Sequence, residues 1–352
     1  MRKTVSVLGH FAEGKNLLNG QTIKTKIVTE ELQHQIGEDQ VLKIDTHGGW
    51  KTLLKAPFDT YRALKSSTNV LIFPAHNGLR VYAPLLVFLR TFFRNRGLHY
   101  AVIGGWLPHF LKKRRALTKH LKKFDGIYVE TNSMKKSLEA QGFSNVFVMP
   151  NCKKLTVLSK DNLVFPKGIP YKLCTFSRVM KEKGIEDAVK AVLSVNESLG
   201  YEAFNLDIYG QVDSSQEEWF SDFQKTFPSS IRYEGLIHFD QSVTVLKDYF
   251  ALLFPTHYEG EGFAGTLIDA FSAGVPVVAS DWKYNSEIVS KDVGYLYPTG
   301  DQAGLESILK QAAKNPTFFN AKRTSCLQVA EQYRIDKIVS ILVKCLTSQN
   351  NL

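Results

Sequence analysis

Residues 251–281, ALLFPTHYEGEGFAGTLIDAFSAGVPVVASD, predict the fold of the chain. The stretch begins as a buried strand, ALLFPTHY, and passes through a glycine-rich loop into a helix, GTLIDAFSAG. It ends in a second strand, VPVVASD. Strand, helix and strand in this order are joined by a right-handed crossover and lie parallel in one sheet. The stretch therefore predicts a βαβ unit with a loop at the N-terminus of its helix.

The same alternation runs along all 352 residues, which is more than one core comfortably serves, so two domains are expected. We predict an N-terminal Rossmann-like domain over 1–155, a linker over 156–170 and a second Rossmann-like domain over 171–335. A C-terminal helix over 336–352 could pack back on the first domain. Both domains are predicted as doubly wound α/β sheets. Ligands of such sheets bind beyond the carboxyl ends of the strands, here in a central cleft.

Charge is distributed unevenly along the chain. Residues 1–150 hold 23 Lys and Arg against 10 Asp and Glu, a net of +13, whereas the remainder holds 21 and 24, a net of −3. A basic half indicates an anionic partner, which could be nucleic acid, a membrane surface or a phosphorylated substrate. The four cysteines lack the spacing of a disulfide framework or a zinc site, and no apolar run approaches the roughly 20 residues of a membrane span. We therefore expect a cytoplasmic protein.

Two carboxylates flank the start of the helix predicted in the opening stretch. Glu261 lies in the glycine-rich loop, and Asp269 follows it by eight residues, inside the helix. Glu259 has no acidic partner at that spacing. Free backbone amides at a helix N-terminus attract anions, and glycines let a ligand approach the backbone closely. Amides for a phosphate, with carboxylates for hydroxyl groups on either side, predict a site for a nucleotide or a sugar.

This stretch resembles the E-x7-E motif of retaining glycosyltransferases with the GT-B fold, specifically those of the large family four (GT4). The family has Glu-Gly-Phe-Gly and a second acid eight residues after the first. Here Asp269 stands where Glu is usual, and Ala264 stands where Gly is usual. The resemblance implies that Glu261 contacts hydroxyls of the donor sugar and that Asp269 contacts the ribose. It also places five neighbours in the donor site: Gly262, Phe263, Ala264, Gly265 and Thr266.

A second segment, FSRVMKEKGIEDAVKAV at 176–192, resembles the part of the same family that holds the donor's diphosphate. The resemblance assigns this role to Arg178 and Lys183, and two cations would offset the charge that builds on a leaving diphosphate. It places Gly210 and Leu236 near the nucleotide base. In the first domain Gly20 would approach the diphosphate or the acceptor, although Asn19-Gly20 is equally a plain turn.

The family usually has a histidine near the donor sugar, after a middle strand of the first domain. Gly104 and Gly105 occupy that place here. His109 lies further along the chain, and His76 follows another strand. A lone histidine is more often structural than catalytic. We prefer His109 to His76 for the role.

The resemblance implies transfer of a hexose from a nucleotide diphosphate sugar to an acceptor, with retention at the anomeric carbon. We expect the acceptor to be a lipid-linked or cell-surface glycan precursor. The catalytic residues would be Glu261, Arg178, Lys183 and His109. The sequence has no DxD motif and no cluster with metal-ligand spacing, so neither a metal nor another cofactor is expected.

Three other classes of protein share parts of this pattern. A glycosidase needs two carboxylates about 5–10 Å apart but does not need the pair Arg178 and Lys183. A basic nucleic-acid-binding protein would explain the charge of the first half, but the basic residues are not interleaved with aromatic ones as in a known module, so no nucleic acid is expected as partner. A nucleotide-sugar epimerase of the GT-B fold comes closer, and the acidic motif disfavours it.

Residues 107–124, LPHFLKKRRALTKHLKKF, predict a helix that starts with Pro108. Its expected apolar face holds Phe110, Leu117, Leu121 and Phe124, and its expected basic face holds Lys112, Arg115, Lys119 and Lys122. The preceding helix, predicted over 84–96, is rich in Leu and Phe and ends in RNR. Either 107–124 is a core-packed helix with a solvated basic side, or it meets an anionic bilayer. We favour the bilayer, with the protein peripheral at the inner face of the membrane.

Overall fold

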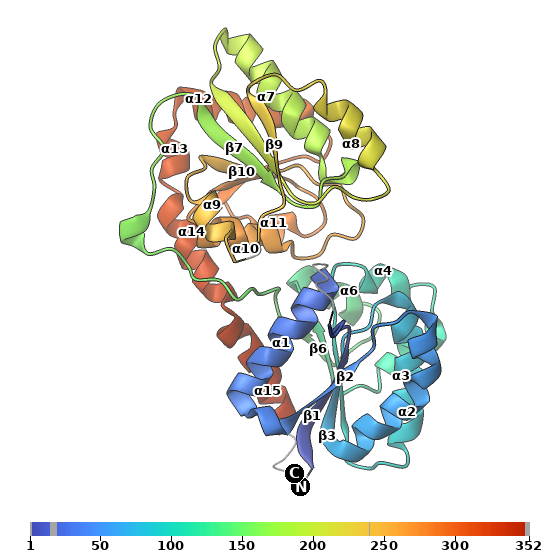
Figure 1. The fold of residues 1–352 in the computed structure, drawn as a ribbon. Helices are drawn as coiled ribbons and strands as arrows, with labels where there is room; N and C mark the ends of the chain where they lie inside the picture. The colour runs from blue at the N-terminus through green and yellow to red at the C-terminus, as the bar shows by residue number, and fades with distance from the viewer. Residues whose placement is uncertain (1, 15–19, 239, 349–352) are drawn as a thin grey trace. The chain divides into compact units, whose positions relative to one another are not determined.

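The computed structural model describes residues 2–14, 20–238 and 240–348, and the chain forms two compact units. The first unit covers Met1–Lys153 and Arg334–Leu352, and the second covers Lys154–Tyr333. Each unit is built on a six-stranded parallel sheet with helices on both faces (Figure 1). The predicted fold class, two doubly wound α/β domains, is confirmed.

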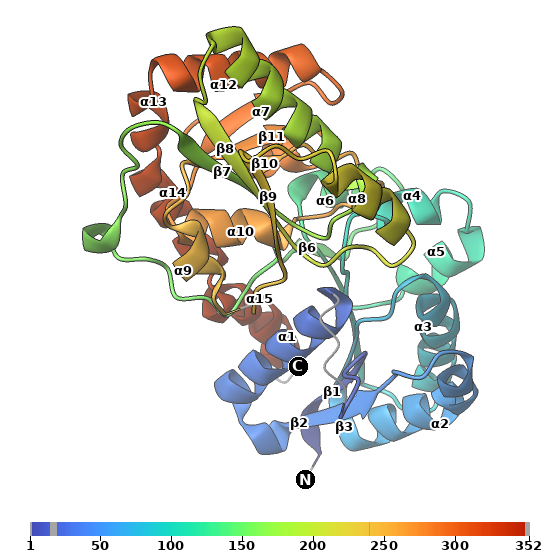
Figure 2. The same ribbon diagram turned by 45° about the horizontal axis from the view of Figure 1, so that its top comes forward.

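The sheet of the first unit has the strand order β2-β1-β3-β4-β5-β6, with every neighbouring pair parallel. Helices α1 and α15 lie side by side on one face of it, and α2 and α3 cover the other (Figures 1 and 2). Its strands are β1 Lys3–Gly9, β2 Val41–Asp45, β3 Ser67–Ile72, β4 Gly97–Ala101, β5 Gly126–Val129 and β6 Val146–Val148. Its helices are α1 Gly20–Ile36, α2 Trp50–Ser66, α3 His76–Arg90, α4 Leu107–Leu111, α5 Arg115–Leu121, α6 Asn132–Glu139 and α15 Ile335–Ser348, with the 3-10 turn η1 Glu38–Gln40.

Three helices of this unit differ from the sequence prediction. Helix α3 begins at His76, eight residues before the predicted start, so Pro84 lies inside it and not at its N-terminus. The buried residues Leu79 and Tyr82 extend the packed face of α3 back toward β3, and this packing outweighs the cost of an internal proline. Helix α2 was not predicted at all, because its bulky apolar residues point outward (see below).

The third difference is the helix predicted over 107–124, which the structure divides into α4 and α5. Arg114, between them, has φ −133° and ψ 63°, outside the helical region. Its Nη1 donates to the carbonyl of Phe110 at 2.8 Å, and its guanidinium lies over the Phe110 ring. The side chain thus satisfies a carbonyl that a continuous helix would have used. The apolar face is otherwise as predicted, since Leu117, Leu121 and Phe124 are buried.

The sheet of the second unit has the order β12-β11-β10-β7-β8-β9, again all parallel. Separate clusters of buried apolar side chains cover its two faces, as expected for a parallel sheet buried on both sides. Its strands are β7 Tyr171–Phe176, β8 Phe204–Tyr209, β9 Ile231–Gly235, β10 Ala251–Phe254, β11 Val277–Ser280 and β12 Gly294–Tyr297. Its helices are α7 Ile185–Leu199, α8 Glu217–Gln224, α9 Ser242–Leu246, α10 Gly265–Ser272, α11 Asn285–Ile288, α12 Gln302–Lys314, α13 Thr317–Asn320 and α14 Arg323–Ala330, with the 3-10 turns η2 Lys160–Asn162, η3 Lys181–Lys183 and η4 Glu331–Tyr333.

The stretch quoted at the outset folds as predicted. It forms strand β10, a loop, helix α10 and strand β11, and β10 and β11 pair in parallel. Within 2–14, 20–238 and 240–348, no helix has the length and apolar character needed to cross a membrane.

Candidate functional site

The carboxyl ends of four parallel strands in the second unit carry most of the predicted site residues. Arg178 and Lys183 follow β7, Gly210 follows β8, and Leu236 follows β9. The loop after β10 carries Glu261. Because these strands are neighbours in one sheet, their following loops meet at one edge, where ligands of doubly wound folds bind.

Lys183 and Glu261, 78 residues apart in sequence, are brought into direct contact at this edge. Lys183 Nζ lies 2.5 Å from Glu261 Oε2, and both side chains are almost completely buried. Thr256 Oγ1, just beyond β10, donates to the same carboxylate oxygen at 2.9 Å. The Lys183 ammonium also lies 5.0 Å from the centre of the Tyr258 ring. The ammonium and the carboxylate are therefore held in fixed positions within one small volume.

Arg178 occupies a more open place beside this pair. Its Nη1 lies 3.0 Å from Asp213 Oδ2, and about half of the Arg178 side chain is exposed. The hydroxyl and backbone amide of Ser215, and then Arg178, hold the pKa of Asp213 below its ordinary value. Asp213 therefore stays ionised and orients an arginine that remains accessible to an anionic ligand.

The N-terminus of α10 lies in the same loop region and has no side-chain cap. Ala264 precedes the helix in an extended conformation, and its side chain offers no cap to the first amides. In the first turn the hydroxyl of Thr266 is buried and has no hydrogen-bond partner among the described residues. Amides that no side chain caps, together with the buried hydroxyl of Thr266, suit an anion such as a phosphate.

Two further predicted residues of the loop and helix, Phe263 and Asp269, are buried. Asp269 is 1% exposed, and its Oδ1 accepts a hydrogen bond from Ser242 Oγ of α9 at 2.8 Å. Phe263 packs edge-to-face on Tyr333, with ring centres 4.8 Å apart. Of these two residues, Phe263 thus anchors the loop through its side chain, whereas Asp269 keeps its carboxylate against α9.

Two glycines hold the strand ends close together. Gly184 has φ +71° at the start of α7, and a Cβ there would lie 2.1 Å from the carbonyl oxygen of Pro255, after β10. Gly210 has φ +136°, and a Cβ there would lie 1.8 Å from the carbonyl oxygen of Ser177, after β7. Both positions require glycine. Leu236, in contrast, is 57% exposed and open to contact.

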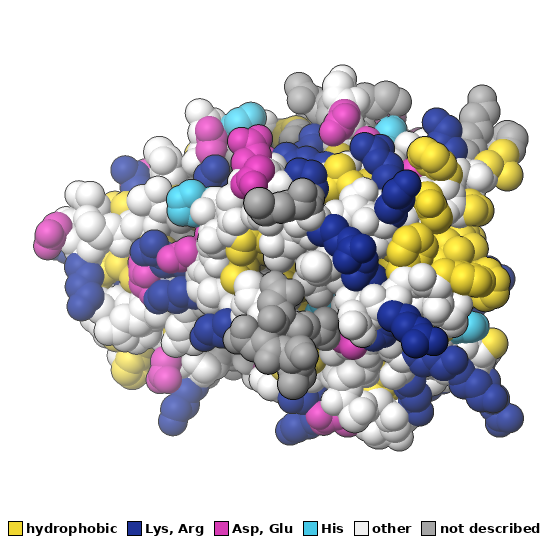
Figure 3. All heavy atoms as spheres, turned by 90° about the horizontal axis from the view of Figure 1, so that it is seen from below, with side chains coloured by type: hydrophobic (Ala, Val, Ile, Leu, Met, Phe, Trp, Pro, Cys, Tyr) yellow, Lys and Arg dark blue, Asp and Glu magenta, His cyan; other side chains and the backbone are white. Residues whose placement is uncertain are grey.

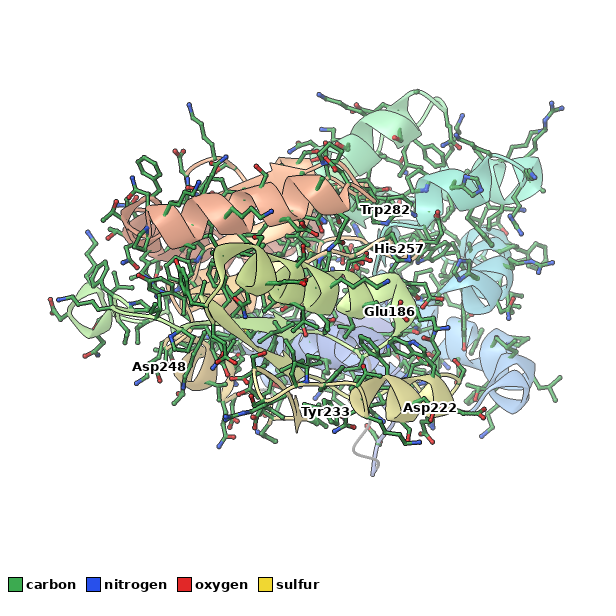
Figure 4. The ribbon with its side chains drawn as sticks, turned by 90° about the horizontal axis from the view of Figure 1, so that it is seen from above. Glu186, Asp222, Tyr233, Asp248, His257 and Trp282 are labelled. Carbon is green, nitrogen blue, oxygen red and sulfur yellow. The ribbon has the colours of Figure 1, made fainter. Side chains whose placement is uncertain are left out.

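The loops after β10 and β11 are joined to each other. Trp282 Nε1 donates to the carbonyl of Tyr258 at 2.8 Å, and the backbone amide of His257 donates to the carbonyl of Glu182 in η3 at 2.8 Å. Figure 4 marks these loops at His257 and Trp282. The loop that carries Glu261 is therefore tied to the segments after both neighbouring strands.

The predicted residues of the first unit have different surroundings. His109 is exposed on the short helix α4. His76, at the start of α3, stacks on Trp106 with ring centres 3.9 Å apart, and burial and the nearby Arg114 lower its pKa. Gly20 begins α1, and a Cβ there would meet no atom within 4 Å, so no local contact requires a glycine. Asn19, and with it the proposed Asn19-Gly20 turn, lies outside the described residues.

Several polar contacts of the structure were not found by sequence reasoning. At the ends of β1 and β2, His47 Nδ1 lies 2.7 Å from His10 Nε2, and His10 Nδ1 lies 2.7 Å from Thr22 Oγ1. Burial, and then His47, lower the pKa of His10. Thr256, Asp213 and Ser242 were missed in the second unit. A polar residue directly after a predicted strand was the available signal for Thr256, but its partner could not be inferred from spacing.

Two Rossmann-like units with these sheets make up the GT-B fold. Sucrose-phosphate synthase from Thermosynechococcus elongatus superposes with a TM-score of 0.77 over 99% of this chain and 100% of its own, at 14% identity. Anabaena HepE in complex with UDP superposes with a TM-score of 0.73 over 99% and 100%, at 13% identity. These likenesses establish the fold.

Sequence comparison adds a family match for the unit that contains the site. Residues 170–315 match the family described as Glycosyl transferases group 1, so this stretch forms a group 1 glycosyltransferase domain. The GtfA subunit of a UDP-N-acetylglucosamine–peptide N-acetylglucosaminyltransferase from Streptococcus gordonii is 28% identical over 226 residues, 61% of this chain. The match spans 43% of that relative, so the chain corresponds to less than half of its length.

Proposed function

We propose that the chain is a retaining, metal-independent glycosyltransferase of the GT4 type that moves a hexose from a nucleotide diphosphate sugar to an acceptor. The observation that carries the proposal is the buried contact between Lys183 and Glu261, beside the N-terminus of α10. The group 1 match over 170–315 supports it, because the match includes both residues.

In the proposed mechanism the site is neutral before the donor binds, because the ammonium of Lys183 and the carboxylate of Glu261 balance each other. The donor supplies a partner for each group. Its diphosphate accepts hydrogen bonds from Lys183, Arg178 and the first amides of α10, and its sugar hydroxyls donate to Glu261. The buried pair is thus exchanged for two ligand contacts without leaving an unpaired charge.

The two cations then stabilise the negative charge that grows on the diphosphate as the glycosidic bond breaks. We assign no enzyme nucleophile. The leaving phosphate guides the acceptor hydroxyl onto the face that it vacates, takes the hydroxyl proton, and thereby retains the anomeric configuration. Asp269 contacts the ribose in this proposal, which requires Ser242 to give up its present hydrogen bond. The role of a histidine at the donor sugar falls to His109, with His76 as the alternative.

The donor that we favour is a UDP sugar. The name of the streptococcal relative includes UDP-N-acetylglucosamine, and HepE was crystallised with UDP. The proposed acceptor is a lipid-linked or cell-surface glycan precursor, met at the inner face of the membrane. The exposed residues Lys112, Arg115, Lys119 and Lys122 of the α4–α5 region support an anionic surface as partner.

A panel of nucleotide sugars tests the proposal. The full chain is incubated with each donor, with and without lipid-linked acceptors, and release of nucleoside diphosphate is followed. We expect release with at least one UDP sugar, faster with an acceptor, and a product of retained anomeric configuration. Interconversion of nucleotide sugars without release would instead identify an epimerase, and no turnover together with tight binding of nucleic acid would support the other alternative.

A further inference from the structure

Helix α2 in the first unit exposes bulky apolar side chains that an ordinary surface helix would bury. Apart from Leu64, the buried positions described in α2 hold small or polar side chains, among them Ala56, Thr60 and Ala63. Its apolar side chains Leu54 and Phe58 are exposed by 72% and 67%. A surface helix normally turns its large apolar residues inward. Packing within the unit therefore does not explain the outer face of α2.

Helix α3 and the turn after it extend this apolar face. Phe88 and Phe92 are exposed and contact each other edge-to-face, with ring centres 5.7 Å apart. Tyr61 of α2 contacts Phe93, with ring centres 5.5 Å apart, so the exposed side chains of the two helices form one surface. The patch, here called the α2–α3 patch, consists of Leu54, Phe58, Tyr61, Phe88 and Phe92. These are five of the eleven large apolar side chains that are exposed in the described part of the chain.

The charge around the patch has one sign. Residues 50–96 contain eight Lys and Arg, of which Arg96 is buried, and one acid, Asp59, which is also buried. Lys55, Arg62 and Lys65 are exposed on α2 beside the apolar stripe. Figure 3 shows hydrophobic side chains gathered at the side where Figure 1 places α2 and α3, with Lys and Arg along their margin. Helix α5, with Arg115 and Lys119, packs beside α3 and continues this basic margin.

We propose that the α2–α3 patch inserts into the headgroup–acyl boundary of an anionic bilayer while the surrounding basic residues bind lipid phosphates. Exposed aromatic and aliphatic side chains within a basic margin fit an interface that is apolar inside and anionic outside. An apolar protein partner could bind the patch alone and would not require the surrounding Lys and Arg side chains. The inference rests on the proposed function, because insertion would serve to bring the site to a lipid-linked acceptor.

Vesicle binding by the full chain tests the insertion. Wild type is compared with Phe58→Ser/Phe88→Ser/Phe92→Ser and with a control that removes three exposed apolar residues of the second unit, Phe165→Ser/Tyr201→Ser/Phe318→Ser. The vesicles are equimolar phosphatidylglycerol and phosphatidylcholine, or phosphatidylcholine alone. We expect the patch variant to bind anionic vesicles on the order of 100-fold more weakly than wild type, and the control to bind as wild type does.

A second readout reports on depth. In Phe92→Trp the indole emission should shift to the blue on addition of anionic vesicles and should be quenched by brominated acyl chains. Equal binding by wild type and the patch variant, or an unshifted emission, would overturn the insertion. So would a wild-type dimer that the patch variant converts to a monomer, because the patch would then be a contact between copies of the chain.

A parallel assay tests the membrane insertion separately from the proposed function. The patch variant should release nucleotide from the donor, with a soluble acceptor, at the wild-type rate. Loss of vesicle binding with that rate intact supports the insertion, whereas an inactive wild type that still binds vesicles through the patch would contradict only the proposed function.

Discussion

Glu261 and Glu259 stand two residues apart in one loop, yet their surroundings differ. Glu261 is buried against Lys183 and Thr256, whereas the Glu259 side chain is 82% exposed and pairs with Lys283. An exposed ion pair contributes about 0–1 kcal/mol. We therefore expect Glu261→Ala to lower kcat/KM by about 100-fold or more, and Glu259→Ala to leave it within about threefold. Steady-state kinetics on both variants measures the difference, and thermal unfolding checks that both variants fold. Equal losses of kcat/KM would mean that the E-x7-E motif is misaligned.

The two cations of the site allow a second comparison at the residue scale. Arg178→Ala and Lys183→Ala should each reduce transfer by about 100-fold, because each removes charge stabilisation from the leaving diphosphate. Lys190→Ala is the matched control, since Lys190 is an exposed lysine of α7 that pairs with Glu186. Arg178→Ala should unfold at the wild-type temperature, because the Arg178 side chain is half exposed and Asp213 keeps its hydrogen bonds from Ser215. Near-normal turnover in both site variants would contradict the assignment of Arg178 and Lys183 to the donor site.

At the scale of elements, the close approach of α7 to β10 positions Lys183. Gly184→Ala would bring a Cβ to 2.1 Å from the Pro255 carbonyl oxygen, so the segment before α7 would have to move. Gly200→Ala is the control, because Gly200 has a similar φ of +75° but no atom within 4 Å of an added Cβ. We expect a loss of about 1 kcal/mol at Gly200 from backbone strain alone, and at least about 2 kcal/mol at Gly184. Urea unfolding of both variants measures the difference, and similar losses would contradict it.

The elements also show what the sequence could predict. The βαβ stretch at 251–281 has strong periodicity and clear glycine punctuation, and it folded as expected. Helix α2 escaped prediction because its outward Leu54 and Phe58 break the rule that apolar residues face the core. The division between α4 and α5 depends on one side chain, Arg114, that competes for a helix carbonyl. The contacts of Lys183, Arg178 and Asp269 join positions 27 to 78 residues apart, which no local pattern specifies.

On the scale of the whole molecule, we expect the basic first half to bind the protein to an anionic membrane surface. Changing Lys112, Arg115, Lys119 and Lys122 together to Gln should release the full chain from anionic vesicles, because each contributes about 1 kcal/mol near such a surface. Activity on a soluble acceptor should survive. A variant with Lys160, Lys167, Lys190 and Lys225 of the second unit changed to Gln removes the same charge elsewhere and should still bind. If neither the first substitution nor added salt weakens binding to anionic vesicles, the α4–α5 surface plays no part in that binding.

The central claim is that the strand-end site of the second unit binds the diphosphate of a nucleotide sugar. Calorimetric titration of UDP into the full chain tests it most directly. We expect one binding site in wild type, binding at least about tenfold weaker in Lys183→Ala, and unchanged binding in Lys190→Ala. Wild-type affinity in Lys183→Ala, or no binding of UDP or any other nucleoside diphosphate by wild type, would contradict it.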